Sequence, residues 1–309
     1  MRVLIALSAA EQSREIVREA AGRPWPANSK FLLLHVLDPF PFARLPVSLE
    51  RAKEATRKEL ETAAEELRKI GWSADTTVIL GRARQAVTKA AATWKADLVL
   101  VGTHGGGALQ RTLLGSTARA VLRRSHCSVE IVRTMEKSKE ETGAGATRIL
   151  VATDGSEFSV AAIRAVAGRA WPKGSVAKVM SLPEPFLPMS QFPYFELEEV
   201  ERLNTAALKA AKKYAAAGAD ALLNANLKAT ADTPFPESSN GREIVKEAER
   251  WHADLIVVGS HGRRGFDRWY MGSVSEYVAL HAPCSVEVIR IPSVPNKTSR
   301  KGVNKGGRR

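Results

Sequence analysis

The sequence predicts an α/β protein built from two tandem, doubly wound domains, each with a five-stranded parallel sheet. The first observation is a repeat: "RVLIALSAAEQS" from Arg2 matches "RILVATDGSEFS" from Arg148, and "WKADLVLVGTHG" from Trp94 matches "WHADLIVVGSHG" from Trp251. The second is the alternation of strand-like apolar runs with segments of helical spacing. The third is that these runs are almost continuously apolar, as expected of parallel strands covered by helices on both faces.

The second copy shows the order of elements most clearly. Near-continuous apolar runs predict buried strands, and apolar residues three or four positions apart predict helices. The prediction in chain order is a strand at 148–153, a helix at 157–170 stopped by Trp171-Pro172, a strand at 175–182, a helix at about 195–217, a weaker strand at 219–229, a helix at 241–251, a strand at 254–259, a helix at 273–281 and a last strand at 285–290.

The repeat also sets the domain boundaries. We expect a first domain over 1–136, a polar linker over 137–146, a second domain over 147–291 and a basic tail over 292–309. The tail has few apolar residues and six Lys or Arg with no acidic residue, which is typical of a disordered segment. The opening "MRVLIALSAA" could pass for a secretion signal, but its twin lies in mid-chain, so we interpret it as a strand.

Composition favours a globular, cytoplasmic protein. Hydrophobic residues make up 44% of the chain and charged residues 26%, which argues against wholesale disorder. Two cysteines, Cys127 and Cys284, fit buried packing in a reducing compartment, and no run reaches the length of a membrane span. Part of the net charge of +13 lies in the tail, which could contact nucleic acid, although a solubilising extension is the favoured interpretation.

A glycine loop follows the fourth predicted strand of the second copy. Gly259 and Gly262 are separated by two residues, and nine more lead to Gly272 and Ser273 at the start of a helix. Glycines let backbone N–H groups approach an anion closely, and a helix N-terminus favours phosphate. The first copy keeps the same spacing at Gly102, Gly105, Gly115 and Ser116.

The residues of this loop could also have purely structural roles. Ser273 and Glu276 have the spacing of a capping box, so Ser273 could serve only as a helix cap. The loop is not a Walker A sequence, because no Gly-Lys-Ser/Thr follows it. His104 and His261 lie inside the two loops, where a loop hydrogen bond is favoured over a metal or catalytic role. The repeated spacing favours phosphate binding.

The segments "ILVATDGSEFS" and "WHADLIVVGSHGRRGFDRWYMGSVSEYVALHAPCSVEVIR", with their first-half counterparts, resemble the universal stress protein family in its tandem form. The resemblance covers the chain apart from the linker and the tail. It implies a Rossmann-like fold of the adenine nucleotide alpha hydrolase type. The glycine spacing is similar to that of the family's ATP-binding branch. The resemblance therefore implies ATP as ligand, with Mg²⁺.

The resemblance also implies a site in the second domain. There Asp154 matches an aspartate that holds the adenosine part, and independently a carboxylate at a strand end can accept a ribose hydroxyl. Arg263 is added for its residue type alone, since its guanidinium could meet phosphate oxygens. The nucleotide-binding residues predicted in this domain are Ala152, Asp154, Leu182, Gly259, Gly262, Arg263, Gly272, Ser273, Val274 and Ser275.

The first domain departs from the pattern. Ser8 stands where the second domain has Asp154, and Arg119 stands in place of Glu276. We therefore expect unequal sites, with the second domain binding more tightly. The weaker site is predicted at Val36, Gly102, Gly105, Gly115, Ser116 and Thr117.

The favoured function is ATP binding with a regulatory role in the stress response. Two alternatives stay open: a stress scaffold that binds no nucleotide, and a slow ATPase. No catalytic residue or resident metal site is predicted, since nothing resembles a triad or a cluster of metal ligands.

The final strands "SVEIV" and "SVEVI" are expected to join the two copies in an internal pseudo-dimer. Glu130 and Glu287 stand there where the family usually has an apolar residue. A charge at a strand edge discourages pairing with further strands. A homodimer of whole chains is left open.

Overall fold

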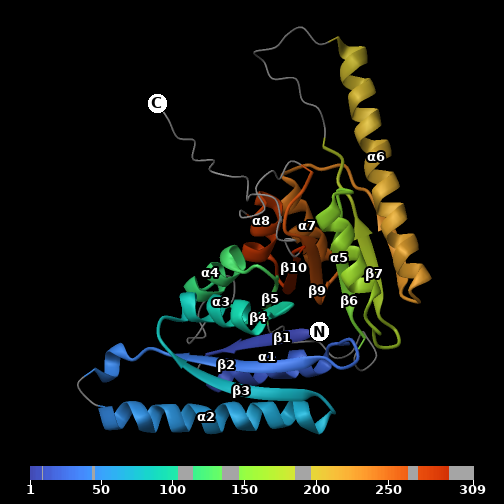
Figure 1. Ribbon diagram of the computed structural model, residues 1–309. Helices are drawn as coiled ribbons and strands as arrows, with labels where there is room; N and C mark the ends of the chain where they lie inside the picture. Colours follow the sequence, from blue (N-terminus) through green and yellow to red (C-terminus); the bar gives the residue numbers. More distant parts are fainter. Residues whose placement is uncertain are drawn as a thin grey trace, which may run out of the picture.

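The computed structural model describes residues 1–8, 10–43, 46–103, 114–133, 146–184, 196–263 and 271–291. Each half of the chain alternates strands with helices (Figure 1). The first half contains β1 (Arg2–Leu7), α1 (Ala10–Gly22), β2 (Lys30–Leu37), the 3-10 helix η1 (Phe40–Phe42), α2 (Pro46–Lys69), β3 (Ser73–Leu80), α3 (Ala83–Trp94), β4 (Leu98–Gly102), α4 (Ser116–Arg124) and β5 (Ser128–Val132). The second half contains β6 (Arg148–Ala152), α5 (Glu157–Ala167), β7 (Val176–Met180), α6 (Leu197–Asn224), β8 (Lys228–Asp232), α7 (Asn240–Arg250), β9 (Leu255–Gly259), α8 (Ser273–His281) and β10 (Ser285–Ile289).

The strands of both halves form one ten-stranded sheet in the order β3-β2-β1-β4-β5-β10-β9-β6-β7-β8. Neighbouring strands within a half are parallel, because the chain returns through a helix before each new strand. β5 and β10 pair antiparallel, with Val129 opposite Val288 and Ile131 opposite Val286. The predicted fold class is confirmed, and the last strands join the two halves as expected.

Helices cover both faces of each half. α1 packs on α2 and α3 on α4, and in the second half α5 packs on α6 and α7 on α8 (Figure 1). Buried clusters lie beneath α1 and α2 and beneath α5 and α6, whereas a third cluster beneath α3, α4, α7 and α8 runs through both halves. Cys127 and Cys284 are buried in this shared cluster, and burial raises the pKa of their thiols to about 11 and about 12.

The predicted weak strand at 219–229 is wrong. α6 continues to Asn224, and β8 begins only at Lys228. Ala219 and Leu222 are buried three positions apart on α6 and belong to the core beneath it. This helical spacing, together with the high helix propensity of alanine and leucine, outweighs the irregular alternation.

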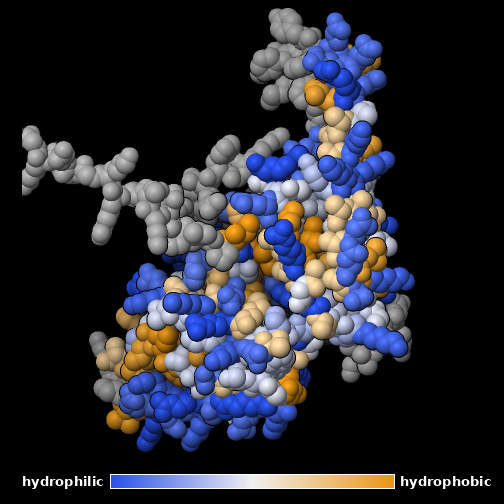
Figure 2. All heavy atoms as spheres, turned by 45° about the vertical axis from the view of Figure 1, so that its right-hand side comes forward, coloured by the Kyte–Doolittle hydropathy of each residue, from blue (hydrophilic) through white to orange (hydrophobic). Residues whose placement is uncertain are grey.

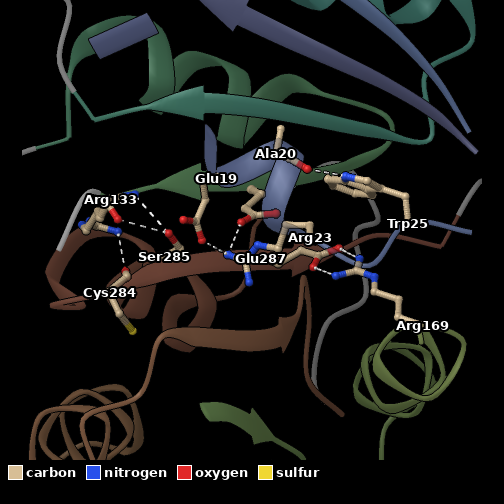
Figure 3. Close-up of polar contacts among 10 residues, drawn as sticks. Glu19, Ala20, Arg23, Trp25, Arg133, Arg169, Cys284, Ser285 and Glu287 are labelled. Carbon is tan, nitrogen blue, oxygen red and sulfur yellow. Dashed lines mark hydrogen bonds and ion pairs between the residues drawn. The ribbon is translucent and has the colours of Figure 1, made fainter. Parts of the chain in front are cut away.

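Two buried ion pairs lie where β5 meets β10 (Figure 3). Glu130 and Glu287 stand opposite each other in register, and they are 0% and 1% exposed. Arg169, just after α5, donates to the two carboxylate oxygens of Glu287 at 2.8 and 2.5 Å. Arg23, just after α1, lies 2.7 Å from Glu130 and 3.0 Å from Glu19. The two glutamates are therefore inside the junction and do not act as the edge charges that the sequence suggested.

Each half also reaches across the junction to hold a helix of the other. Arg133, after β5, donates to the carbonyl oxygen of Ala279 near the end of α8 at 2.7 Å. Arg290, after β10, donates to the carbonyl oxygen of Leu122 in α4 at 2.8 Å. A cation at a helix C-terminus interacts favourably with the helix dipole. Burial lowers the pKa of Arg133 to about 10, so its charge persists at neutral pH.

Candidate functional site

A cavity of about 380 Å³ opens at the carboxyl ends of β6, β7 and β9 in the second half. This is the edge where doubly wound sheets bind ligands. The structure brings together all ten residues predicted for this domain on its walls: Ala152, Asp154, Leu182, Gly259, Gly262, Arg263, Gly272, Ser273, Val274 and Ser275. Whether they bind a nucleotide stays a prediction.

The carboxylate of Asp154 is held by two backbone N–H groups. Ser156 donates to Oδ1 at 3.0 Å, and Arg263 donates to Oδ2 at 2.9 Å. Burial alone would raise the pKa of Asp154, but the hydrogen bonds from Ser156 and Arg263 outweigh it and leave the pKa below its usual value. Asp154 is therefore ionised at neutral pH and can accept a hydrogen bond from a ligand.

Two loop glycines have a packing reason of their own. A Cβ atom at Gly262 would lie 2.8 Å from Oδ2 of Asp154, so a side chain there would displace the carboxylate. A Cβ atom at Gly259 would lie 2.7 to 2.8 Å from backbone atoms of Phe158 and Ser159, in the first turn of α5. Glycine at 259 thus lets α5 pack on β9 whether or not an anion binds.

The N-terminus of α8 forms one end of the cavity. Gly272 is its N-cap residue, no side chain caps it, and Ser273 is the first helical residue. The alternative of a capping box does not hold, because Ser273 is the first helical residue and not the N-cap, and Glu276 instead accepts a hydrogen bond from Nε of Arg123 in α4 at 2.8 Å. The N–H groups of the first helical turn have no acceptor within the helix. They are suited to bind an anion.

The hydroxyl of Ser275 is used within the protein. Its Oγ lies 2.9 Å from the carbonyl oxygen of Gly272 and 3.0 Å from that of Ser260, and Ser275 is buried. The N–H of Gly272 also donates to the carbonyl oxygen of Ser260, at 2.8 Å. These bonds tie the start of α8 to the end of β9. The backbone N–H of Ser275 belongs to the first turn of α8, whose N–H groups have no acceptor within the helix.

Arg263 lies at the rim of the cavity. Its guanidinium is 3.6 Å from a carboxylate oxygen of Glu184 and 5.9 Å from the ring centre of Tyr214 in α6. About half of its side chain is exposed. The backbone N–H of Arg263 thus binds Asp154, and its side chain lies against Glu184 and Tyr214 at the edge of the cavity.

His261 lies beneath the loop and is 7% exposed. Its Nδ1 is 3.0 Å from the hydroxyl of Ser260, and its ring centre is 4.9 Å from that of Phe158. Burial, followed by the charge of Arg290, lowers its pKa, so the ring is neutral at pH 7. Within the described part of the chain no group of three acidic, His or Cys side chains could hold a metal ion. The predicted loop hydrogen bond is present for His261, whereas His104 lies outside the described residues.

The first half has an equivalent cavity of about 340 Å³ at the ends of β1, β2 and β4. Ser8 lines it at the position of Asp154, so no carboxylate stands there. As in α8, the helix that follows begins after a glycine, Gly115, without a side-chain cap. Gly105 lies outside the described residues, and the other predicted residues line the cavity: Val36, Gly102, Gly115, Ser116 and Thr117.

Several residues that line the cavity of the second half were not predicted from the sequence. The apolar wall of this cavity includes Met180 at the end of β7, Val258 in β9 and Ile244 in α7. Asn240 also lines the cavity, at the start of α7. Met180 and Val258 lie near the carboxyl ends of predicted strands, and this position could have indicated that they line the site. Nothing local shows that Asn240 and Ile244 face the same cavity.

The similarity to known proteins extends over most of the chain. The model of the universal stress protein family matches residues 1–133 and 145–290. The chain belongs to the universal stress protein family. This family membership supports a role in the stress response.

Two relatives and one solved structure illustrate the match. A universal stress protein of Mycolicibacterium smegmatis is 27% identical over 305 residues, covering 93% of this chain and 96% of its own length. One of Methanocaldococcus jannaschii is 28% identical over 142 residues, covering 44% of this chain and 84% of its own. The crystal structure of a universal stress protein from Archaeoglobus fulgidus has a TM-score of 0.61 and 17% identity, covering 94% of this chain and 98% of that one. This tandem universal stress protein has no helix, among its described residues, that is long and apolar enough to cross a bilayer.

Proposed function

We propose that this universal stress protein binds an adenine nucleotide in the cavity of its second half and that this binding regulates its part in the stress response. One observation carries the proposal: a single cavity combines the open N-terminus of α8, the ionised Asp154 and an apolar wall. These three features match the three parts of a nucleotide.

Each part of the nucleotide would meet matching chemistry. The phosphates would accept hydrogen bonds from the N–H groups of the first turn of α8, whose dipole favours negative charge. A ribose hydroxyl would donate to Asp154. The base would lie against the apolar wall that includes Leu182 and Ile244. Mg²⁺ prefers phosphate oxygens and water and would enter coordinated by the nucleotide.

A scaffold that binds no nucleotide is the second candidate, and Gly259 favours it. Because α5 requires glycine at that position for packing, part of the glycine spacing has an explanation without a ligand. The slow ATPase would need a group that activates water, and no described contact assigns one.

The test is to denature freshly purified protein, identify any released nucleotide by chromatography and count it per chain. Added ATP is then titrated into wild type, Asp154→Ala and the matched first-half variant Ser8→Ala. We expect about one tight ATP per chain and a loss of at least tenfold in affinity for Asp154→Ala alone. Released ADP would support the ATPase. No nucleotide and no binding of added ATP would contradict the proposal and favour the scaffold.

A further inference from the structure

Asn240 brings a polar side chain to the apolar wall of the main cavity. It is the first residue of α7 and is partly buried, and it lines the cavity together with Ile244, one turn later on the same helix. Residues four positions apart lie on one face of a helix, so the side chain of Asn240 stands above that of Ile244. A base that packs on Ile244 therefore has Asn240 at its edge.

The amide of Asn240 is available to a ligand. The N-cap residue of α7 is Ser239, so Asn240 does not cap the helix, and its side chain has no hydrogen-bond partner among the described residues. An amide offers an acceptor oxygen and an NH2 donor, whereas an apolar surface holds any flat ring alike. Figure 2 shows apolar surface of the second half (orange) between charged side chains, beside the column formed by α6. The choice between two bases therefore needs a polar group such as this amide.

The start of α7 lies close to α8, whose N-terminus is suited to bind phosphate. Gly241 is buried, and a Cβ atom there would lie 2.9 Å from Cβ and Cδ1 of Tyr277 in α8. Glycine thus lets the first turn of α7 pack closely on α8. In the common anti conformation of a nucleotide, the base edge that carries N7 lies on the side of the 5′-phosphate. Asn240 therefore stands towards the N7 edge of the base.

The first half lacks this amide. The internal repeat aligns Ala83 with Asn240 and Val87 with Ile244. Ala83 is likewise the first residue of its helix, α3, and both Ala83 and Val87 line the cavity of the first half. An apolar residue is thus present at the second position in both halves, whereas the amide is a property of the second half.

We propose that Asn240 selects adenine over guanine in the second half, by pairing its amide with N6 and N7 of the base. The inference rests on the proposed function, since the base must first lie in the cavity. Oδ1 accepts a hydrogen bond from the 6-amino group, and Nδ2 donates to N7. Guanine presents two acceptors on this edge, O6 and N7, so one of the two hydrogen bonds is lost. A double hydrogen bond of this kind favours the matching base by about tenfold or more.

The test measures the affinity of the tight site for ATP, GTP and 7-deaza-ATP, in which a C–H group replaces N7. The ligands are titrated into wild type and into Asn240→Ala, which carries the residue of the first half at this position. Ser239→Ala is the matched control, since Ser239 is adjacent and exposed, lies outside the cavity walls and makes no capping hydrogen bond. Alanine has the highest helix propensity, so neither substitution should unfold α7.

We expect wild type to bind ATP about tenfold more tightly than GTP and severalfold more tightly than 7-deaza-ATP. In Asn240→Ala the three affinities should lie within about twofold of one another, and Ser239→Ala should behave as wild type. An unchanged ratio of ATP to GTP affinity in Asn240→Ala would overturn the inference and leave ATP binding intact. So would 7-deaza-ATP that binds wild type as tightly as ATP. If wild type binds none of these ligands, the proposed function fails and takes this inference with it.

Discussion

Replacing Arg169 by methionine should destabilise the protein strongly, because it leaves the charge of Glu287 unpaired inside the junction. Both side chains are almost fully buried, at 4% and 1% exposure, and two hydrogen bonds join them. The guanidinium of Arg169 also lies 5.7 Å from the ring centre of Trp25 in the other half and 5.8 Å from that of Trp171. Removing one partner of a buried ion pair typically costs about 3–5 kcal/mol.

The assay is urea denaturation of wild type, Arg169→Met and the double variant Arg169→Met with Glu287→Leu. The double variant removes both charges and keeps apolar volume, so we expect it to lie within about 2 kcal/mol of wild type. A loss below about 1 kcal/mol in Arg169→Met would refute the reasoning. So would a double variant that is as unstable as the single one, because the loss would then come from packing.

Three further predictions concern the junction and the loop. Burial raises the pKa of Glu130 to about 7 against the opposing charge of Arg23, and the charge of Glu287 adds to the rise, so between pH 4.5 and 7 the folded protein keeps this proton while the unfolded chain, with an ordinary pKa near 4.5, has released it. The stability gained from this group is full below pH 4.5 and is lost as the pH rises towards 7, and Glu130→Gln should flatten that part of a denaturation profile measured against pH. Arg133→Met should lower the free energy of unfolding by about 2 kcal/mol, since it leaves carbonyl oxygens at the end of α8 without a charged donor. Arg290→Met is the matched comparison, because Arg290 donates in the same way to a carbonyl oxygen of α4. No loss of stability in either variant would contradict the role of these arginines. Gly262→Ala should weaken ATP binding about tenfold with little change in melting temperature, because the added Cβ meets the Asp154 carboxylate. Unchanged affinity in an ATP titration would show that this carboxylate does not contact the ligand.

Much of the fold could be predicted because the same sequence pattern occurs in both halves of the chain. The apolar runs of β6 and β9 are too continuous for a half-exposed sheet. The internal repeat shows which elements of the two halves are equivalent. The end of α6 could not be predicted in this way. The segment from Ala219 to Leu227 suits either a helix or a strand locally, and burial against α5 and β7 decides for the helix.

The site was predictable in its positions and less so in its contacts. Loop spacing and the family resemblance indicated Asp154 and the glycines, which do gather around one cavity. The partner of Glu276 could not be predicted, because Arg123 lies 153 positions earlier in the sequence and meets it only through the junction of the halves. The use of Ser275 as an internal tie is equally invisible in the sequence, since its acceptors come from the end of β9 and from the helix N-cap.

The pairing of β5 with β10 places two similar units in one polypeptide, and this changes what each unit is free to become. In a symmetric pair of separate chains, a substitution alters both binding sites at once, because one gene encodes both. Here the partner is tethered, so its local concentration does not fall on dilution, and each unit can accept changes that the other does not share. Ser8 in one half and Asp154 in the other are such a divergence. A fused pair can thus assign different ligands to its two sites without losing the shared core that holds them together.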